Sequence, residues 1–212
     1  MYKKFFKRTI DILLSLIATP FVLLVIAIMA PFIYLEDKGP VFYNGTRRGR
    51  NGKSFKMFKL RSMYVNSPDI KAADGSTYNG EDDPRVTKIG RFMRKTSIDE
   101  LPQILNVLIG DMSFIGPRPS LARIPYEELP EVSKYRLQVR PGVTGYAQAY
   151  YRNSITQDEK FKHDCYYVDN VTFLLDVKII LQTVKSVLKR ENIYVSQEAK
   201  PAEETKEPVE TK

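Results

Sequence analysis

Two neighbouring carboxylates, Asp99 and Glu100, are the side chains of this chain best suited to carry out a reaction. Because proline is tolerated only in the first turn of a helix, Pro102 predicts a helix that starts between Asp99 and Leu101, with Asp99 as its N-cap. Carboxylates at that position can hold a divalent cation or attack a phosphorus centre to form an acyl phosphate. Spacing alone favours a simpler interpretation, in which Asp99 caps the helix and Glu100 is solvated, since Asp-Glu pairs are common.

Four arginines lie in or beside predicted turns, namely Arg94, Arg118, Arg140 and Arg152. A guanidinium group binds phosphate through two parallel hydrogen bonds, and a rigid loop lowers the entropic cost of positioning it. Prolines flank Arg118, and Pro141 follows Arg140. For these two, phosphate binding is favoured over the alternative of a solvated loop arginine.

The segment Ser54–Arg61 alternates apolar with polar or basic residues, which predicts a half-buried strand with a cationic face. Lys59 and Arg61 are one strand period apart, so we expect their side chains to point the same way. The pair either binds a substrate phosphate or forms a basic stripe against a membrane, and the two interpretations can coexist.

The composition narrows the partners and the metals. The net charge of +8 indicates an anionic partner, which could be nucleic acid, phospholipid headgroups or a phosphorylated substrate. The single cysteine, Cys165, excludes a disulfide framework within the chain and a cysteine metal cluster, and the single His163 excludes a site built from several histidines. Any metal must therefore have oxygen ligands, which favours Mg²⁺ or Mn²⁺.

The element that must place these residues relative to a membrane is the apolar run Ile10–Leu35, whose only charge is Asp11. It is long enough to cross a bilayer, which takes about 20 apolar residues. Pro20 lies in its middle and should kink the helix, and basic residues flank both ends. A helix kinked at Thr19-Pro20 that enters and leaves on one face satisfies both flanks, while an ordinary single-span anchor is an equal alternative.

The remaining pattern predicts a mixed α/β fold, with a small helix-rich cytoplasmic domain, a few short strands and interfacial amphipathic helices. A short strand is expected at Val41–Tyr43, a polar loop at 65–84 and a short helix at Pro125–Tyr135. A long amphipathic helix is expected at Thr172–Arg190, where it would lie either in the core or at a membrane interface. The predicted organisation is a basic interfacial segment at 1–9, a kinked membrane helix at 10–36, a globular domain at 37–196 and a disordered tail at 197–212.

Three blocks occur in order along the chain: Lys95–Gln103 (KTSIDELPQ), Gly110–Pro119 (GDMSFIGPRP) and Arg140–Gly145 (RPGVTG). Together they resemble the signature of the bacterial sugar transferases, the monotopic polyprenyl-phosphate phosphoglycosyl transferases. Further matching blocks are Lys59–Met63, Arg152-Asn153, Glu159–Phe161, and the group Asp164, Tyr167, Asp169 and Asn170. The resemblance covers essentially residues 1–195 and is closest to the minimal form with one membrane helix.

This resemblance implies a reaction in which sugar 1-phosphate moves from a UDP-sugar to undecaprenyl phosphate and UMP is released. The product would be the first lipid-linked intermediate of a capsule, exopolysaccharide, O-antigen or glycoprotein glycan. By the motif, Asp99 would be the nucleophile and Glu100 would help hold Mg²⁺. Lys59, Arg94, Arg118 and Asp164 match active-site positions, and Arg61, Arg140 and Arg152 are added as substrate-binding candidates.

The implied partners are a UDP-sugar, undecaprenyl phosphate and inner-membrane lipids, with no nucleic acid, and the implied location is the cytoplasmic face of the bacterial cell membrane. The resemblance also favours the re-entrant form of the membrane helix, and it leaves the oligomeric state open, with a homodimer as one option. The chain departs from the family at Thr19 (commonly Ser), where Thr can form the same hydrogen bond and the helix break is expected to persist. It also departs at Tyr146 (often Trp) and Tyr151 (often Gly), near the expected substrate region, which bears on the identity of the sugar more than on the type of reaction.

Two other functions compete with this expectation. One is a membrane-tethered basic module that binds an anion without chemistry, which the charge alone would support. The other is a glycosyl transferase that moves only the sugar and therefore releases UDP.

Overall fold

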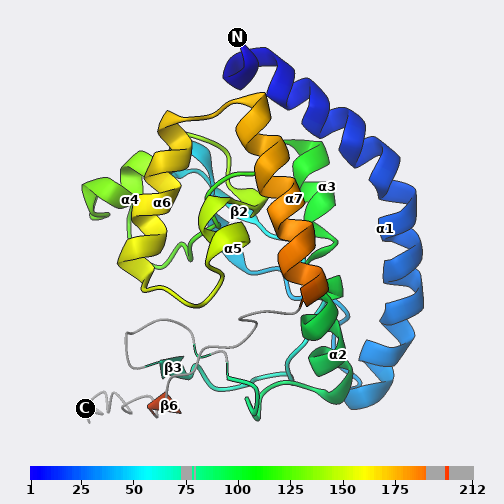
Figure 1. Cartoon of the computed structure of the whole chain (residues 1–212). Helices are drawn as coiled ribbons and strands as arrows, with labels where there is room; N and C mark the ends of the chain where they lie inside the picture. Colours follow the sequence, from blue (N-terminus) through cyan, green and yellow to red (C-terminus); the bar gives the residue numbers. More distant parts are fainter. Residues whose placement is uncertain (73–77, 79, 190–198, 201–212) are drawn as a thin grey trace, which may run out of the picture.

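A computed structural model describes residues 1–72, 78, 80–189 and 199–200, and it is rich in helix with a few short strands, as the sequence predicts (Figure 1). The N-terminal elements are η1 (Tyr2–Phe6), α1 (Lys7–Asp37), β1 (Thr46–Arg48), η2 (Arg50–Gly52), β2 (Ser54–Lys56) and β3 (Lys71–Ala72). The central elements are α2 (Lys88–Thr96), η3 (Ile98–Glu100), α3 (Gln103–Ile109) and β4 (Ser113–Ile115). They are followed by α4 (Glu131–Arg136), β5 (Gly142–Thr144), α5 (Tyr146–Tyr150), α6 (Gln157–Asp169), α7 (Phe173–Lys189) and β6 (Ala199–Lys200).

The helix α1 presents one narrow face to the rest of the protein. Its buried residues are four or seven positions apart, the spacing of one helix face: Asp11, Ser15, Val22, Met29 and Ile33. Most of its other apolar side chains are exposed. Among the described residues, α1 is the one helix long and apolar enough to cross a membrane.

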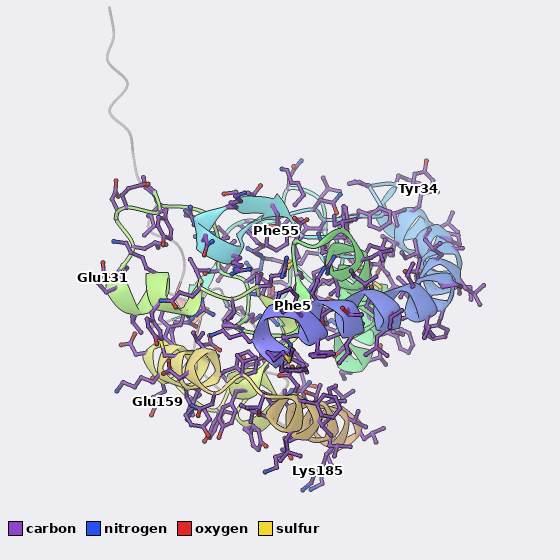
Figure 2. The ribbon with its side chains drawn as sticks, turned by 90° about the horizontal axis from the view of Figure 1, so that it is seen from above. Phe5, Tyr34, Phe55, Glu131, Glu159 and Lys185 are labelled. Atoms are coloured by element: carbon purple, nitrogen blue, oxygen red, sulfur yellow. The ribbon has the colours of Figure 1, made fainter. Side chains whose placement is uncertain are left out.

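Pro20 does not interrupt α1, which is a continuous helix of 31 residues. Figures 1 and 2 show that the helix curves around the body of the protein, from Phe5 near its start to Tyr34 near its end. The hydroxyl of Thr19 donates a hydrogen bond to the carbonyl of Ser15 at 2.7 Å, one turn earlier. The position of the predicted kink, Thr19-Pro20, therefore lies inside one continuous, curved helix.

The N-terminal end of α1 is bound to the body of the protein by charged side chains. Lys7 forms an ion pair with Asp176 of α7 at 2.7 Å, and Arg8 donates to the carbonyl of Val107 in α3 at 2.6 Å. Lys3 donates to a carbonyl at the end of α6 at 2.8 Å. Three basic side chains of the predicted interfacial segment thus bind the folded body of the protein, through one buried carboxylate and backbone carbonyls.

The C-terminal end of α1 is bound to the same body. Arg61 makes two hydrogen bonds of 2.6 Å with the carboxylate of Asp37, and both side chains are largely buried. The carboxylate of Glu36 accepts hydrogen bonds from the backbone N–H groups of Lys88 and Ile89, which begin α2. A residue of the apolar helix thus satisfies two of the N–H groups that a helix start leaves unpaired.

The strands form three pairs within the described residues: β1 with β2 antiparallel, β3 with β6 antiparallel, and β4 with β5 parallel. The predicted strand over Ser54–Arg61 is wrong beyond Lys56, where the chain leaves the ladder, and the predicted strand at Val41–Tyr43 is only a single bridge between Phe42 and Leu60. The β4–β5 pair requires glycine, since a Cβ on Gly142 would lie 2.1 Å from the nitrogen of Gly116.

The predicted long helix at Thr172–Arg190 is confirmed as α7, and one of its faces has the core role that the sequence left open. Ile179 is fully buried and packs with Ile115 and Tyr167 in one core cluster. On its other side Leu174 and Leu188 are 65% and 78% exposed. This helix therefore closes the core on one side and presents an apolar face on the other.

Two further predictions concern less regular segments. The helix expected at Pro125–Tyr135 is α4, which spans Glu131–Arg136. The predicted disordered tail at 197–212 lies outside the described residues, apart from Ala199 and Lys200, which pair with β3. The described part of the predicted loop at 65–84 contains β3.

Candidate active site

Asp99 and Glu100 lie in the short 3₁₀ turn η3, which joins α2 to α3. The prediction that Asp99 caps the next helix is wrong, because Ile98–Glu100 close their own turn through a bond from Leu101 N–H to the Ile98 carbonyl at 3.2 Å. The helix α3 therefore begins only at Gln103, with Pro102 at its N-cap. The two carboxylates occupy the corner between two helices.

Lys59 contacts both carboxylates. Its ammonium group lies 2.9 Å from Oδ2 of Asp99 and 3.1 Å from Oε1 of Glu100. The next residue, Leu60, donates its backbone N–H to the carbonyl of Asp99 at 3.0 Å, which holds the segment after β2 against η3. The exposed fractions of the side chains are 3% for Asp99, 22% for Glu100 and 19% for Lys59. The structure thus brings Lys59 to a carboxylate pair that lies about 40 residues later in the sequence.

Arg118, from the loop after β4, completes this carboxylate cluster, which consists of Lys59, Asp99, Glu100 and Arg118. One of its terminal nitrogens lies 3.0 Å from Oε1 of Glu100, and 57% of its side chain is exposed. A substrate that approaches the cluster from solvent would meet Arg118 first.

The charges of the carboxylate cluster shift one another's pKa values. Burial alone would raise the pKa of Glu100, but Arg118 and Lys59 hold it well below its ordinary range. Burial alone would lower the pKa of Lys59, but Asp99 and Glu100 raise it above its ordinary value. Glu100 is therefore ionised and Lys59 protonated near neutral pH.

Asp164 acts on the carboxylate cluster through another residue. It is buried and accepts two hydrogen bonds from Arg136, at 2.9 Å and 2.5 Å. Arg136 in turn donates to the backbone carbonyl of Arg118 at 2.7 Å and to the hydroxyl of Ser120 at 3.1 Å. Asp164 therefore positions the loop that carries Arg118.

Arg94 lies beside the segment that carries Lys59. It is half-buried in the last turn of α2, and its Nε donates to the hydroxyl of Ser62 at 3.0 Å. The structure thus places Arg94 against the segment that follows Lys59.

Three predicted substrate-binding residues lie elsewhere. Arg61 is paired with Asp37 at the end of α1, so the expectation that Lys59 and Arg61 point the same way is wrong; the chain is no longer a regular strand there. Arg140 donates to the carbonyl of Gly110 at 2.9 Å, beyond the C-terminal end of α3. Arg152 donates to the carbonyl of Ser186 in α7 at 3.2 Å.

Arg47 in β1 is a candidate that the sequence analysis missed. Its Nη1 is buried and has no hydrogen-bond partner among the described residues. Burial lowers its pKa, and the charges of Arg118 and Arg123 lower it further, so these guanidinium groups lie close enough to interact. In the sequence, Arg47 belongs to the basic run Arg47-Arg48-Gly49-Arg50, whose position after the apolar run indicates only a membrane flank. Arg136, which holds the loop that carries Arg118, lies in no sequence motif that would indicate this role.

The donor set fits a magnesium ion. Within the described residues, no group of three or more His, Cys, Asp or Glu side chains could hold a metal. Asp99 and Glu100 each use one oxygen for Lys59, which leaves a second oxygen on each carboxylate for a cation. Mg²⁺ is commonly bound by one or two carboxylates together with substrate phosphates and water, so a pair is sufficient.

Comparison with known proteins gives a consistent family. The sequence profile of the family described as "Bacterial sugar transferase" matches residues 2–190. The chain is 44% identical over 193 residues to "Galactosyl transferase CpsE" of Streptococcus agalactiae and 38% identical over 208 residues to "Undecaprenyl-phosphate galactose phosphotransferase" of Salmonella typhimurium. It is 42% identical over 194 residues to "Uncharacterized sugar transferase EpsL" of Bacillus subtilis.

The alignments cover most of this chain but different fractions of the three relatives. The alignments cover 86%, 90% and 90% of this chain. The chain spans 42% of the length of the Streptococcus and Salmonella proteins and 89% of the Bacillus protein. The shared part includes every residue of the carboxylate cluster, which lies within the range of the family profile.

Proposed function

The chain belongs to the bacterial sugar transferase family, and we propose that it moves sugar 1-phosphate from a UDP-sugar to undecaprenyl phosphate. The products would be UMP and a lipid-linked diphosphosugar, the first intermediate of a capsule, exopolysaccharide, O-antigen or glycoprotein glycan. The acceptor is supported by the Salmonella relative, whose name states transfer to undecaprenyl phosphate. The observation that carries the proposal is the carboxylate cluster, in which Lys59 contacts both Asp99 and Glu100.

The proposed chemistry has two steps at one phosphorus atom. An oxygen of Asp99 attacks the phosphorus that bears the sugar, the bond to the oxygen shared with the uridine-bearing phosphate breaks, and UMP leaves with the electron pair. An oxygen of undecaprenyl phosphate then attacks the same phosphorus, and Asp99 leaves as a carboxylate. Each step replaces one P–O bond by another, so no oxidant or further reactant is required.

The other residues of the cluster neutralise charge and hold groups in place. Lys59 and Arg118 lie where negative charge develops on the transferring phosphoryl group, and pre-positioned cations are effective there because they need no reorganisation. Glu100 is the carboxylate we assign to Mg²⁺, which when bound supplies further neutralisation of the diphosphate. Asp164 and Arg136 hold the Arg118 loop, Arg47 is a further cation within electrostatic reach of Arg118 and Glu100, and Arg94 binds the segment that follows Lys59.

We further propose that α1 is re-entrant and that the domain lies on the cytoplasmic face. The helix is 31 residues long, about 46 Å at 1.5 Å per residue, which would suffice to span a bilayer. Both of its ends are nevertheless bound to the same body, through the Lys7–Asp176 and Arg61–Asp37 pairs. A helix that crossed the bilayer would place its two ends on opposite sides of the membrane, so the attachment of both ends to one body supports a helix that stays on one side.

The function is tested by identifying the nucleotide released. Purified protein in detergent, with UDP-sugars, undecaprenyl phosphate and Mg²⁺, should release UMP, and excess chelator should stop the release. Asp99→Asn should abolish UMP release while membrane binding is retained, and Asp158→Asn, an exposed residue of α6, serves as the matched control. Release of UDP would show a transferase of sugar alone, and unchanged release from Asp99→Asn would reject the proposed nucleophile. Absence of release with every sugar tested would favour a binding module.

The topology is tested by cysteine labelling in intact cells. In a Cys165→Ser background, Tyr2→Cys and Gly45→Cys should both be protected from a membrane-impermeant reagent and become reactive after permeabilisation. Labelling of position 2 in intact cells would place the N-terminus outside and contradict the re-entrant form.

A further inference from the structure

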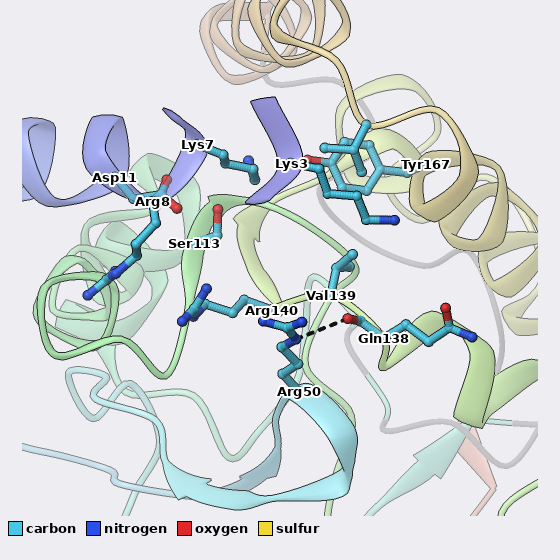
Figure 3. A pocket seen from close by; sticks show the side chains of 11 residues that line it. Lys3, Lys7, Arg8, Asp11, Arg50, Ser113, Gln138, Val139, Arg140 and Tyr167 are labelled. Carbon is cyan, nitrogen blue, oxygen red and sulfur yellow. Dashed lines mark hydrogen bonds between the residues drawn. The ribbon is translucent and has the colours of Figure 1, made fainter. Parts of the chain in front are cut away.

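A second cationic region lies beneath the N-terminal end of α1, away from the carboxylate cluster. It is a cavity of ≈ 60 Å³ whose lining includes Lys3, Lys7, Arg8, Arg50 and Arg140 (Figure 3). Lys3, Lys7 and Arg8 come from the start of the N-terminal helix, and Arg50 and Arg140 from the segments opposite. We call this cavity the N-terminal pocket. Its volume has room for a group of phosphate size.

The cations of the N-terminal pocket are held mainly by backbone carbonyls. Arg8 donates to the carbonyls of Val107 and Leu108 at 2.6 Å and 3.0 Å. Arg140 and Arg50 each donate through Nε, to the carbonyls of Gly110 at 2.9 Å and Gln138 at 3.1 Å. A carbonyl orients a cation but carries no net charge, so these contacts position the positive charges without neutralising them.

Carboxylates compensate only part of this charge. Asp11 lines the N-terminal pocket, and its carboxylate accepts a hydrogen bond from the backbone N–H of Phe114. Lys7 is paired with Asp176. Among the described residues, no carboxylate forms an ion pair with Lys3, Arg8, Arg50 or Arg140. Burial and the neighbouring Arg8 and Arg50 lower the pKa of Arg140, which shows that like charges face one another here.

A purely structural role explains part of the arrangement. Arg8 and Arg140 contact the carbonyls at and just beyond the C-terminal end of α3, where cations are stabilised by the helix dipole. Lys3 has the same role at another helix, since it donates to the carbonyl of Val168 at the C-terminal end of α6. The role does not account for Arg50, whose carbonyl partner Gln138 lies in no helix, or for the convergence of all these cations on one cavity. Five cations converging on a cavity of this size therefore indicate an anion.

The surroundings of the N-terminal pocket identify the source of the anion. Phe5 and Phe6 beside it are 70% and 54% exposed, and Leu13 and Leu14, one to two turns along α1, are 55% and 44% exposed. Phe173, whose ring meets that of Tyr2 edge to face, is 57% exposed. The cations thus adjoin the apolar surface that would enter the membrane, at the level where lipid phosphate groups lie.

The N-terminal pocket shares no residue with the carboxylate cluster. Asp99 and Glu100 precede α3, while Arg8 and Arg140 bind carbonyls of residues 107–110 at its other end. The seven residues of α3 at helical rise place about 10 Å between its two ends. A single phosphate group cannot contact both regions.

We propose that the N-terminal pocket binds the phosphate group of an anionic phospholipid and thereby holds the start of α1 at the membrane surface. This inference concerns a lipid that is not consumed, and it does not rest on sugar-phosphate transfer. Each Lys or Arg near a membrane surface contributes about 1 kcal/mol to attraction for anionic lipid. Loss of two of the five cations should therefore weaken lipid binding about tenfold or more.

The test is native mass spectrometry of the full chain in neutral detergent, titrated with dioleoylphosphatidylglycerol. The wild type should retain one lipid, and Lys3→Gln/Arg50→Gln should lower its apparent affinity about tenfold or more. Both substituted side chains are exposed, so this variant is expected to fold. The control Lys53→Gln/Lys56→Gln removes two exposed cations outside the N-terminal pocket and should stay within about twofold of the wild type.

Two further arms identify the ligand. Arg140→Gln should weaken retention of phosphatidylglycerol as well, and dioleoylglycerol, which lacks the phosphate, should not be retained. Equal affinities of the two double variants would overturn the proposal. Displacement of the lipid by an equal concentration of inorganic phosphate would also overturn it, since the site would then belong to a soluble anion.

Discussion

The two ends of α3 lie in opposite electrostatic surroundings. On the N-terminal side, Asp99 and Glu100 meet Lys59 and Arg118 through side-chain ion pairs of 2.9 to 3.1 Å. On the C-terminal side, Arg8 and Arg140 are held by uncharged carbonyls. The first region balances its own charges, and the second retains an excess of positive charge. A balanced cluster suits a ligand that arrives with its own cation, whereas an unbalanced pocket suits a bare anion.

The largest effect should come from removing the cation shared by the two carboxylates. We expect Lys59→Met to lower the rate of UMP release about 1,000-fold, because the transferring phosphoryl group loses a pre-positioned charge and two carboxylates lose their common partner. The measurement is the initial rate of UMP release at saturating UDP-sugar. Lys56→Met, an exposed lysine three residues earlier, is the control. A loss below tenfold would mean that the carboxylate cluster does not depend on charge balance.

The next effect should come from the buried pair that holds the Arg118 loop. Asp164→Asn leaves the guanidinium of Arg136 buried without its counter-ion, which should lower the free energy of unfolding by about 3 kcal/mol. For a chain of this size, that corresponds to a fall in Tm of roughly 6–12 °C. Thermal denaturation in detergent measures it.

The double variant Asp164→Leu/Arg136→Met separates charge from packing in this pair. Because it removes both buried charges together, its Tm should lie closer to that of the wild type than to that of Asp164→Asn. A double variant less stable than Asp164→Asn would show that the pair contributes through its hydrogen bonds to Arg118 and Ser120.

The smallest effect concerns pH. The pKa of Glu100 is depressed in the folded protein, so its contribution to stability is present above its unfolded value of about 4.3 and is lost as pH falls. The pKa of Lys59 is raised, so its contribution is present below about 10.4 and is lost as pH rises through the folded value. The contribution of these two groups should therefore be level between about pH 5 and pH 10.

Glu100→Gln isolates the acidic side of this profile. Between pH 5 and pH 3, the Tm of the wild type should fall about 2–4 °C further than that of Glu100→Gln, since the variant has no carboxylate there to protonate. Parallel Tm profiles for the two proteins would contradict the depressed pKa.

The parts of the fold that the sequence predicts are those set by composition over many residues. The apolar run predicts α1, and the spacing of Leu174, Ile179 and Leu188 predicts α7, because a helix forms its hydrogen bonds locally. The strands fail where pairing depends on distant segments. Ser54–Arg61 alternates correctly, yet only Ser54–Lys56 has a partner strand, and the β4–β5 pair depends on the close approach of two glycines.

The candidate site divides in the same way. Asp99, Glu100 and Arg118 lie in recognisable motifs, and the structure brings all three to Lys59 or to one another. The partners in the pairs Arg61–Asp37 and Arg136–Asp164 are separated by 24 and 28 residues, and no local pattern predicts that they meet. The sequence predicts Arg61 and Asp164 as substrate-binding residues, whereas in the structure each forms a largely buried ion pair within the protein, Arg61 with Asp37 and Asp164 with Arg136.

The contacts of Glu36 and Asp37 make the folded body dependent on this particular helix. At the end of α1, the carboxylate of Glu36 accepts hydrogen bonds from the first N–H groups of α2, and the carboxylate of Asp37 pairs with the buried guanidinium of Arg61. A different hydrophobic anchor grafted onto residue 38 would bring lipid affinity but not these two side chains. The helix is thus not an interchangeable tether, because a replacement would leave the start of α2 and the guanidinium of Arg61 without these partners.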